Sequence, residues 1–427
     1  MSSLDWLLDL CAVAQASSDT ITTNIAPLQD ALPPSQDPWY TPPDSFKSRH
    51  PGDVIRIRSA PESLKAIVGN SSAAYHILYR TTDSRNEPSW AVTTLFIPSS
   101  FCHSESGKAA ILSYQLAYNS ANVDSSPSFD LSGIMANKEP NLGIKPSTSL
   151  IDEMLSFGWI VNTPDHLGPT AAFGASVQGG HATLDALRAV HNLFNLRENP
   201  GLTTAIWGYS GGSIATLAAA ELQPQYAPEL EIAGMALGGL ADDITADFDS
   251  INKSVIAGSL VAILLGITSQ YPEERQYLES RLIPDTKSEF MSVKDIEVTE
   301  AVKQFSGKDI YLFFKNGSAD LKVPQLQELY NKQARLGYKG VPSMPMFMYK
   351  AIQDQFCPTH LTDATVDRLC SAGAEITYER NTVGNHVSEI ENGKPRAFRW
   401  LRGIFDGSYK SPASKRHVAD VTVDVST

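Results

Sequence analysis

The sequence has little cysteine, a deficit of positive charge and no long apolar run. Four cysteines among 427 residues are too few for a disulfide framework, and the absence of C-x-x-C and H-E-x-x-H motifs gives no support for a metal site. Lys and Arg number 34 against 47 Asp and Glu, a net charge of −13, and no basic cluster is long enough to follow nucleic-acid phosphates. The apolar run at 255–267 is shorter than the ~20 residues that span a bilayer. We therefore expect no metal, nucleic-acid partner or integral membrane association.

The first sixteen residues only partly resemble an export signal. They contain leucines followed by an A-x-A-like sequence, but no Lys or Arg precedes the apolar part, and Asp5 and Asp9 interrupt it. We interpret residues 1–16 as a retained amphipathic helix and expect a cytoplasmic protein, with secretion as the alternative.

A nucleophile elbow is predicted in the stretch AIWGYSGGSIATLAAA, residues 205–220. Gly208-Tyr209-Ser210-Gly211-Gly212 fits the G-x-S-x-G pattern, in which small neighbours let the chain reverse and expose the serine hydroxyl. Apolar residues before the turn are typical of a buried strand, and the small residues after it are typical of a helix packed on a sheet. Because the pattern alone is weak, the flanking strand and helix carry the prediction that Ser210 is a nucleophile.

The remaining periodicity predicts one enlarged α/β domain. Segments 74–80 and 90–98 predict a hairpin, and 109–115, 159–162, 232–237, 310–314, 346–351 and 375–379 predict further strands between helices, the rhythm of a mostly parallel sheet. We expect an N-terminal extension wrapping the core (1–60), a first core part (61–241), a helical cap or lid (242–305), a second core part (306–407) and a mobile tail (408–427).

Chain order restricts the partners of Ser210, because an α/β-hydrolase places its acid and then its histidine after the serine. Of the downstream histidines, His386 lies in a loop between a predicted strand and helix, whereas His360 begins a helix and His417 lies in the predicted tail. Asp354, in the turn after a strand, is the favoured acid, and Asp320 is the alternative.

Several motifs in order resemble the fungal secretory lipase family: YTPP at 40–43, SYQLAYNSANVDSSPS at 113–128, TPDHLG at 163–168, GYSGG at 208–212 and YAPEL at 226–230. The resemblance runs from about Asp37 to Gly407 and implies an α/β-hydrolase with a helical cap, a Ser210, Asp354 and His386 triad, and ester hydrolysis without a cofactor. It also implies relatives that deacetylate fungal secondary metabolites.

Two departures from the family pattern affect the expected activity and location. Asn119 stands where the family usually has an oxyanion-hole aspartate, and its amide can donate a hydrogen bond at any pH. The cysteine that secreted members tend to carry near Asp124 is missing, which favours an intracellular, biosynthetic relative.

These observations predict a serine esterase for a small or medium ester, with the Gly211 N–H and Asn119 binding the oxyanion. An acyltransferase of secondary metabolism, a triacylglycerol lipase and a non-catalytic binding protein on the same fold stay open.

Overall fold

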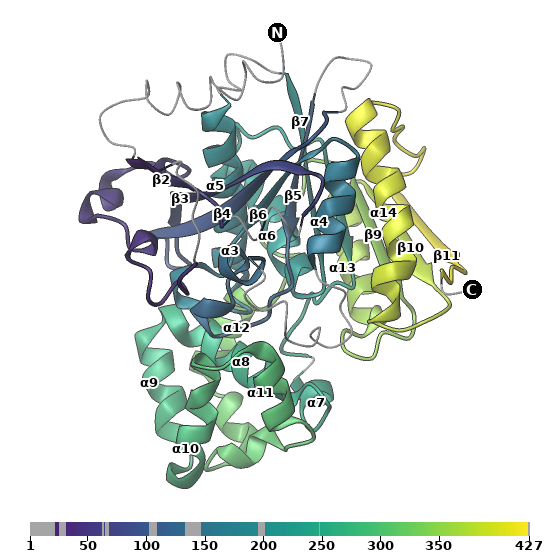
Figure 1. Cartoon of the computed structure of the whole chain (residues 1–427). Coiled ribbons are helices and arrows are strands. Elements are labelled where there is room, and N and C mark those ends of the chain that lie inside the picture. The colour runs from purple at the N-terminus through teal and green to yellow at the C-terminus, as the bar shows by residue number, and fades with distance from the viewer. Residues whose placement is uncertain are drawn as a thin grey trace.

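The computed structural model describes residues 22–24, 31–61, 64, 68–101, 109–132, 147–194, 201–246 and 248–425. They form one sheet with strand order β1-β2-β3-β4-β6-β5-β7-β8-β9-β10-β11 (Figure 1). The strands are β1 (Thr22–Asn24), β2 (Val54–Ser59), β3 (Ser71–Thr82), β4 (Pro88–Pro98), β5 (Ala109–Gln115), β6 (Ile160–Pro164), β7 (Leu202–Tyr209), β8 (Gly234–Gly238), β9 (Met346–Ala351), β10 (Ile376–Asn381) and β11 (Arg416–Val421). In the order of the sheet, neighbouring strands from β6 through β5, β7, β8, β9 and β10 to β11 all pair in parallel. The pairs β2–β3, β3–β4 and β4–β6 are antiparallel. The predicted hairpin of β3 and β4 and the predicted α/β-hydrolase arrangement are confirmed.

Helices cover both faces of the sheet. The flanking helices are α4 (Ser147–Ser156), α5 (Ser176–Leu193), α6 (Gly211–Tyr226), α13 (Thr359–Ser371) and α14 (Ser388–Asp406). Small residues let α5 and α6 pack closely, since a Cβ at Gly180 would lie 3.1 Å from the Ala218 Cβ and a Cβ at Gly179 3.1 Å from the Ala215 Cβ. This close contact fixes α6, and therefore the turn at its start, against the carboxyl end of β7.

A helical insertion between β8 and β9 gathers beyond one end of the sheet (Figure 1). It includes α7 (Phe248–Ile251), α8 (Ala257–Ile267), α9 (Pro272–Arg281), α10 (Pro284–Met291), α11 (Val298–Phe305) and α12 (Pro324–Gln333). The strand predicted at 310–314 is wrong, because this segment is the 3-10 helix η8 (Ile310–Phe313). Ile310 and Phe313 are buried while Leu312 is 70% exposed, a one-sided pattern with a spacing of three. In the part of the chain that the structure describes, the sheet therefore resumes only at β9.

Both ends of the described chain contribute strands that the sequence did not indicate. β1 and β2 extend the sheet within the segment predicted to wrap the surface. The predicted mobile tail holds β11, which pairs in parallel with β10 from Ile376↔Arg416 to Asn381↔Val421. Its polar side chains gave no burial signal, because an edge strand is held mainly by backbone hydrogen bonds. The predicted helix at residues 1–16 lies outside the described residues.

Candidate active site

The turn between β7 and α6 holds Ser210 in a strained backbone conformation. Ser210 has φ 51° and ψ −124°, a region that residues other than glycine rarely adopt. The turn tolerates no side chain on either side of it: a Cβ at Gly208 would lie 2.5 Å from the Gly212 carbonyl oxygen, and one at Gly212 only 1.9 Å from the Gln115 carbonyl oxygen. The sequence therefore folds here as a tight elbow that presents the Ser210 hydroxyl.

Two hydrogen bonds connect Ser210 to a histidine and then to a carboxylate. The Ser210 Oγ lies 2.8 Å from His386 Nε2, and His386 Nδ1 lies 2.7 Å from Asp354 Oδ2. Asp354 follows β9, and His386 lies between β10 and α14, so both reach the same carboxyl edge of the sheet as Ser210. Because Nδ1 faces a carboxylate, it carries the proton, and Nε2 can accept the hydroxyl proton of Ser210.

The surroundings of Asp354 favour its ionised form. Burial on its own raises the pKa of this carboxyl, but the hydrogen bond with His386, the nearby Lys350 ammonium and a backbone hydrogen bond outweigh burial and lower the pKa. The backbone N–H groups of Phe356 and Cys357 donate to its Oδ1 at 3.0 and 2.8 Å. Asp354 therefore holds both a charge and an orientation suited to fixing the His386 ring.

Gly211 and Asn119 lie against each other beside the elbow. Gly211 opens α6, so its N–H is one of the helix donors without an intrahelical acceptor. A Cβ at Gly211 would lie 1.8 Å from Asn119 Oδ1, so a larger residue here would push the Asn119 amide aside. Asn119 itself has φ 43°, which asparagine and aspartate tolerate better than most residues. Its Oδ1 is buried without a hydrogen-bond partner, so the amide can turn its NH₂ toward Gly211 without losing a bond at that atom.

The alternative acid and histidines lie elsewhere. Asp320 is in the 3-10 helix η9 (Gly317–Leu321) and pairs with Arg281 at 2.9 Å. His360 is exposed in the first turn of α13, and His417 is exposed on β11. Of the candidates predicted from the sequence, the structure brings Ser210, Asp354 and His386 together. Asp320, His360 and His417 lie apart from them.

The sequence reasoning missed the residues that hold the histidine loop. The Tyr209 hydroxyl donates to the His386 carbonyl oxygen at 2.7 Å, and the His386 N–H donates to Gln355 Oε1 at 3.1 Å. Tyr209 precedes Ser210 and Gln355 follows Asp354 in the sequence, and these positions were the available signal. Only the fold shows that both residues contact His386.

One set of described side chains has the donor types of a metal site, and it overlaps this chain of hydrogen bonds. Ligand atoms of Asp354, Cys357 and His386 lie within 4.8 Å of one another. Asp354 and His386 already share a hydrogen bond, and we therefore assign these residues to that hydrogen bond and not to a metal site. The described cysteines, Cys357 and Cys370, are not in disulfides.

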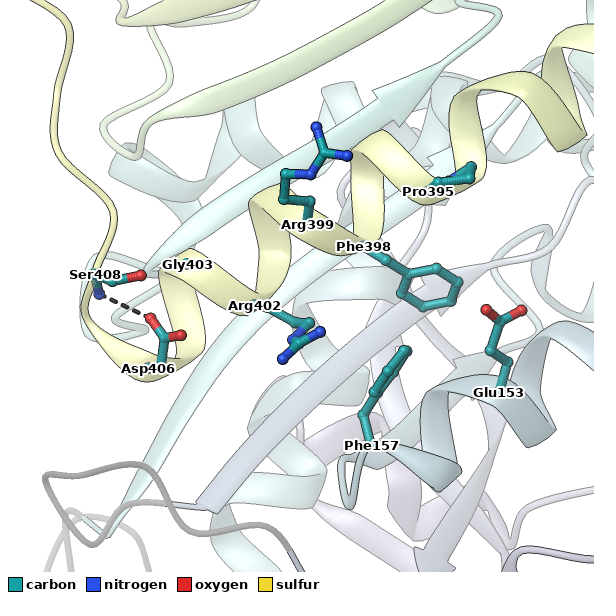
Figure 2. Close-up of a pocket in the computed structure, with 9 residues that line it drawn as sticks. All are labelled: Glu153, Phe157, Pro395, Phe398, Arg399, Arg402, Gly403, Asp406 and Ser408. Atoms are coloured by element: carbon teal, nitrogen blue, oxygen red, sulfur yellow. Dashed lines mark hydrogen bonds between the residues drawn. The ribbon is translucent and has the colours of Figure 1, made fainter. Parts of the chain in front are cut away.

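The space beside the elbow is small. A cavity of about 10 Å³ lies next to Gly211, which is room for about one water molecule at most. It is lined by His166, Leu167, Phe173, Gly174, Ala175, Ser176, Gly179, Gly211, Ile214 and Ala215. A groove of about 490 Å³ runs instead between α4 and α14, where Figure 2 shows Phe157 and Phe398 with Arg399 and Arg402 around it. That groove contains none of the residues of the elbow.

Comparisons with known proteins identify a family, sequence relatives and a structural neighbour of this chain. A family model described as secretory lipase matches residues 138–412. A probable trichothecene esterase of Stachybotrys chartarum is 55% identical over 425 residues, covering 100% of this chain and 88% of that protein. The trichothecene C-3 esterase of Fusarium sporotrichioides is 42% identical over 420 residues, covering 95% and 89%. The crystal structure of Candida antarctica lipase A in its closed state matches with a TM-score of 0.81 at 26% identity, covering 92% of this chain and 91% of that one.

The comparisons do not support the predicted cytoplasmic location, because the matching family is described as secretory. No helix in the described ranges is long and apolar enough to cross a membrane. The fold, the sequence relatives and the family model agree that the chain is an ester hydrolase and belongs to the secretory lipase family.

Proposed function

We propose that Ser210, His386 and Asp354 act as the catalytic triad and that the chain hydrolyses its ester through an acyl-enzyme. His386 Nε2 takes the Ser210 proton as Oγ attacks the ester carbonyl carbon, and Asp354 stabilises the imidazolium that forms. The alcohol leaves with that proton. Water then attacks the acyl-enzyme with His386 again as base, and the free acid is released.

The observation that carries this proposal is the unbroken chain of contacts at 2.8 and 2.7 Å on a strained serine. The Gly211 N–H and the Asn119 amide are the proposed donors to the oxyanion of the tetrahedral intermediate. A binding protein without catalytic activity would have no need for a strained serine aligned on a histidine and a carboxylate.

The proposed substrate is a short-chain ester, an acetate, of a fungal secondary metabolite of the trichothecene class. The two relatives with 55% and 42% identity are named as trichothecene esterases. The space beside Gly211 is only about 10 Å³, so each added acyl carbon would have to displace side chains such as Phe173 or Ile214, which favours a short acyl group over a long one. A triacylglycerol lipase is the second candidate, supported by the description of the matching family.

Turnover of matched esters tests the proposal. The purified protein is incubated with an acetylated trichothecene, p-nitrophenyl acetate and emulsified p-nitrophenyl palmitate, and the deacetylated alcohol and free acid are measured by mass spectrometry. We expect acetate release from the first two and little release of palmitate, with all activity lost in Ser210→Ala. Highest activity on palmitate, raised further by the emulsion surface, would favour the lipase.

The same assay separates hydrolysis from acyl transfer. Increasing concentrations of an acceptor alcohol are added, and the new ester is measured against free acetate. A hydrolase releases mainly acetate throughout, whereas a transferase forms mainly the new ester.

A further inference from the structure

A buried ammonium group lies behind the carboxylate of the proposed triad. Lys350, on β9, has a fully buried side chain. Its Nζ donates to the Leu240 carbonyl oxygen at 2.8 Å and to Thr362 Oγ1 at 3.0 Å, and it lies 3.9 Å from Asp354 Oδ2. A buried charge is costly unless it is paired and hydrogen-bonded, and here several groups on different elements provide those partners.

Asp242 completes this buried set on the other side of Thr362. Its Oδ1 accepts from Thr362 Oγ1 at 3.4 Å, and its Oδ2 accepts from Thr365 Oγ1. Burial raises the pKa of Asp242, and the Lys350 ammonium opposes that rise. The ammonium therefore interacts with two carboxylates, of which Asp354 lies next to His386.

Resting on the proposed function, we propose that Lys350 is a positioning residue for catalysis, whose ammonium holds the Asp354 carboxylate and opposes protonation of His386. Asp354 alone would stabilise the imidazolium strongly. A cation on the far side of the same carboxylate offsets part of that attraction, because charges interact strongly over short distances inside a protein. Neutral His386, the form that accepts the serine proton, then persists to lower pH.

Other ionisable groups that pack around this set add few charges. Tyr209 and Tyr378 have pKa values raised first by burial, so both are neutral, and Glu389 lies on α14, where it pairs with Arg396. The groups that surround His386, Asp354 and Lys350 on the neighbouring elements are Tyr209 on β7, Asp242 after β8, Cys357 after β9, Tyr378 on β10 and Glu389 on α14. Apart from His386 itself, Lys350 is thus the cation nearest to Asp354 among the described ion pairs.

The test is the pH dependence of kcat/KM for p-nitrophenyl acetate in three variants. In Lys350→Met the acidic limb of the profile should move to higher pH by about 1 unit, so that activity at pH 5.5 falls roughly tenfold more than activity at pH 8. Lys350→Arg keeps the positive charge and should keep the acidic limb where it is in the wild type, even if its kcat is lower. Asp242→Asn removes the charge that neutralises Lys350 and should move the limb to lower pH.

A distant, partly buried cation supplies the control. Arg188 lies on α5 and pairs with Asp185 at 2.8 Å and with Glu229, which follows α6, at 2.6 Å. Arg188→Met should therefore lower the melting temperature without moving the limb. Equal loss at every pH in Lys350→Met would overturn the proposal, and so would an unchanged or upward-shifted limb in Asp242→Asn. If Lys350→Met does not fold, Asp242→Asn decides the matter. A wild type that releases no acetate would instead contradict the proposed function itself.

Discussion

Removing part of the Ile214 side chain should widen the acyl selectivity of the enzyme. Ile214 lies in the first turn of α6, is 6% exposed and lines the cavity of about 10 Å³ beside Gly211. Ile214→Ala removes three carbons at a helical position, where alanine is favoured. Each substrate CH₂ that gains a buried place is worth about 0.8 kcal/mol, close to a fourfold change in kcat/KM. Butanoate has two more CH₂ groups than acetate, so the butanoate-to-acetate ratio should rise by roughly 15-fold.

The assay compares kcat/KM for p-nitrophenyl acetate, butanoate and octanoate. Ile404→Ala is the matched control, because Ile404 is 8% exposed within α14, away from the elbow. Both variants should lose about 2–5 kcal/mol of unfolding free energy, but only Ile214→Ala should change the ratio. If the wild type already prefers octanoate, or if the ratio stays the same in Ile214→Ala, this cavity does not limit the acyl chain.

Substitutions at three further positions test what single side chains contribute. Asn119→Ala should lower kcat by about 10² to 10³ with little change in KM. Asn119→Asp should lose activity at neutral pH and recover part of it on acidification. If steady-state assays show that kcat is unchanged from pH 5 to 8 in either variant, backbone donors alone bind the oxyanion. Asp354→Asn should lower kcat by about 10⁴ with the circular dichroism spectrum unchanged, because His386 then loses its orienting acceptor, and a loss below tenfold would point to another acid. Burial raises the pKa of Asp165 to about 7 despite two hydrogen bonds from Ser128. Ionising this buried carboxyl must therefore lower stability as pH rises from about 4 to 7, and Asp165→Asn should raise the free energy of unfolding at pH 8 by on the order of 3 kcal/mol, with no gain at pH 4 in urea titrations.

The elbow was predictable because its signals are local. The small residues around Ser210 are required by backbone atoms within the same turn and in the adjacent strand end, so the sequence there has few alternatives. Asp354 and His386 were found from chain order and from their places after strands, which is a property of the fold class. The supporting contacts of Tyr209, Gln355 and Lys350 depend on which loops meet in space, and no spacing in the sequence reports that.

The failures have physical reasons of the same kind. The apolar run at 310–314 resembles a strand, but Leu312 points to solvent, and the segment turns as a 3-10 helix because only one side can pack on the insertion. β11 has exposed His417 and Arg416, and its position is set by pairing with β10, a contact that is distant in sequence. The predicted cytoplasmic location rested on the N-terminal pattern and on the missing cysteine near Asp124, and the description of the matching family as secretory does not support it.

Covalent labelling tests the proposed triad most directly. A fluorophosphonate probe should add one adduct to the intact protein, located by peptide mapping on Ser210, and the adduct should be absent from Ser210→Ala and strongly slowed in His386→Ala. The expected rate also falls with acidification, because protonated His386 cannot take the serine proton. A folded wild-type protein that stays unlabelled, or one labelled equally in Ser210→Ala, would contradict the assignment of Ser210 as the nucleophile.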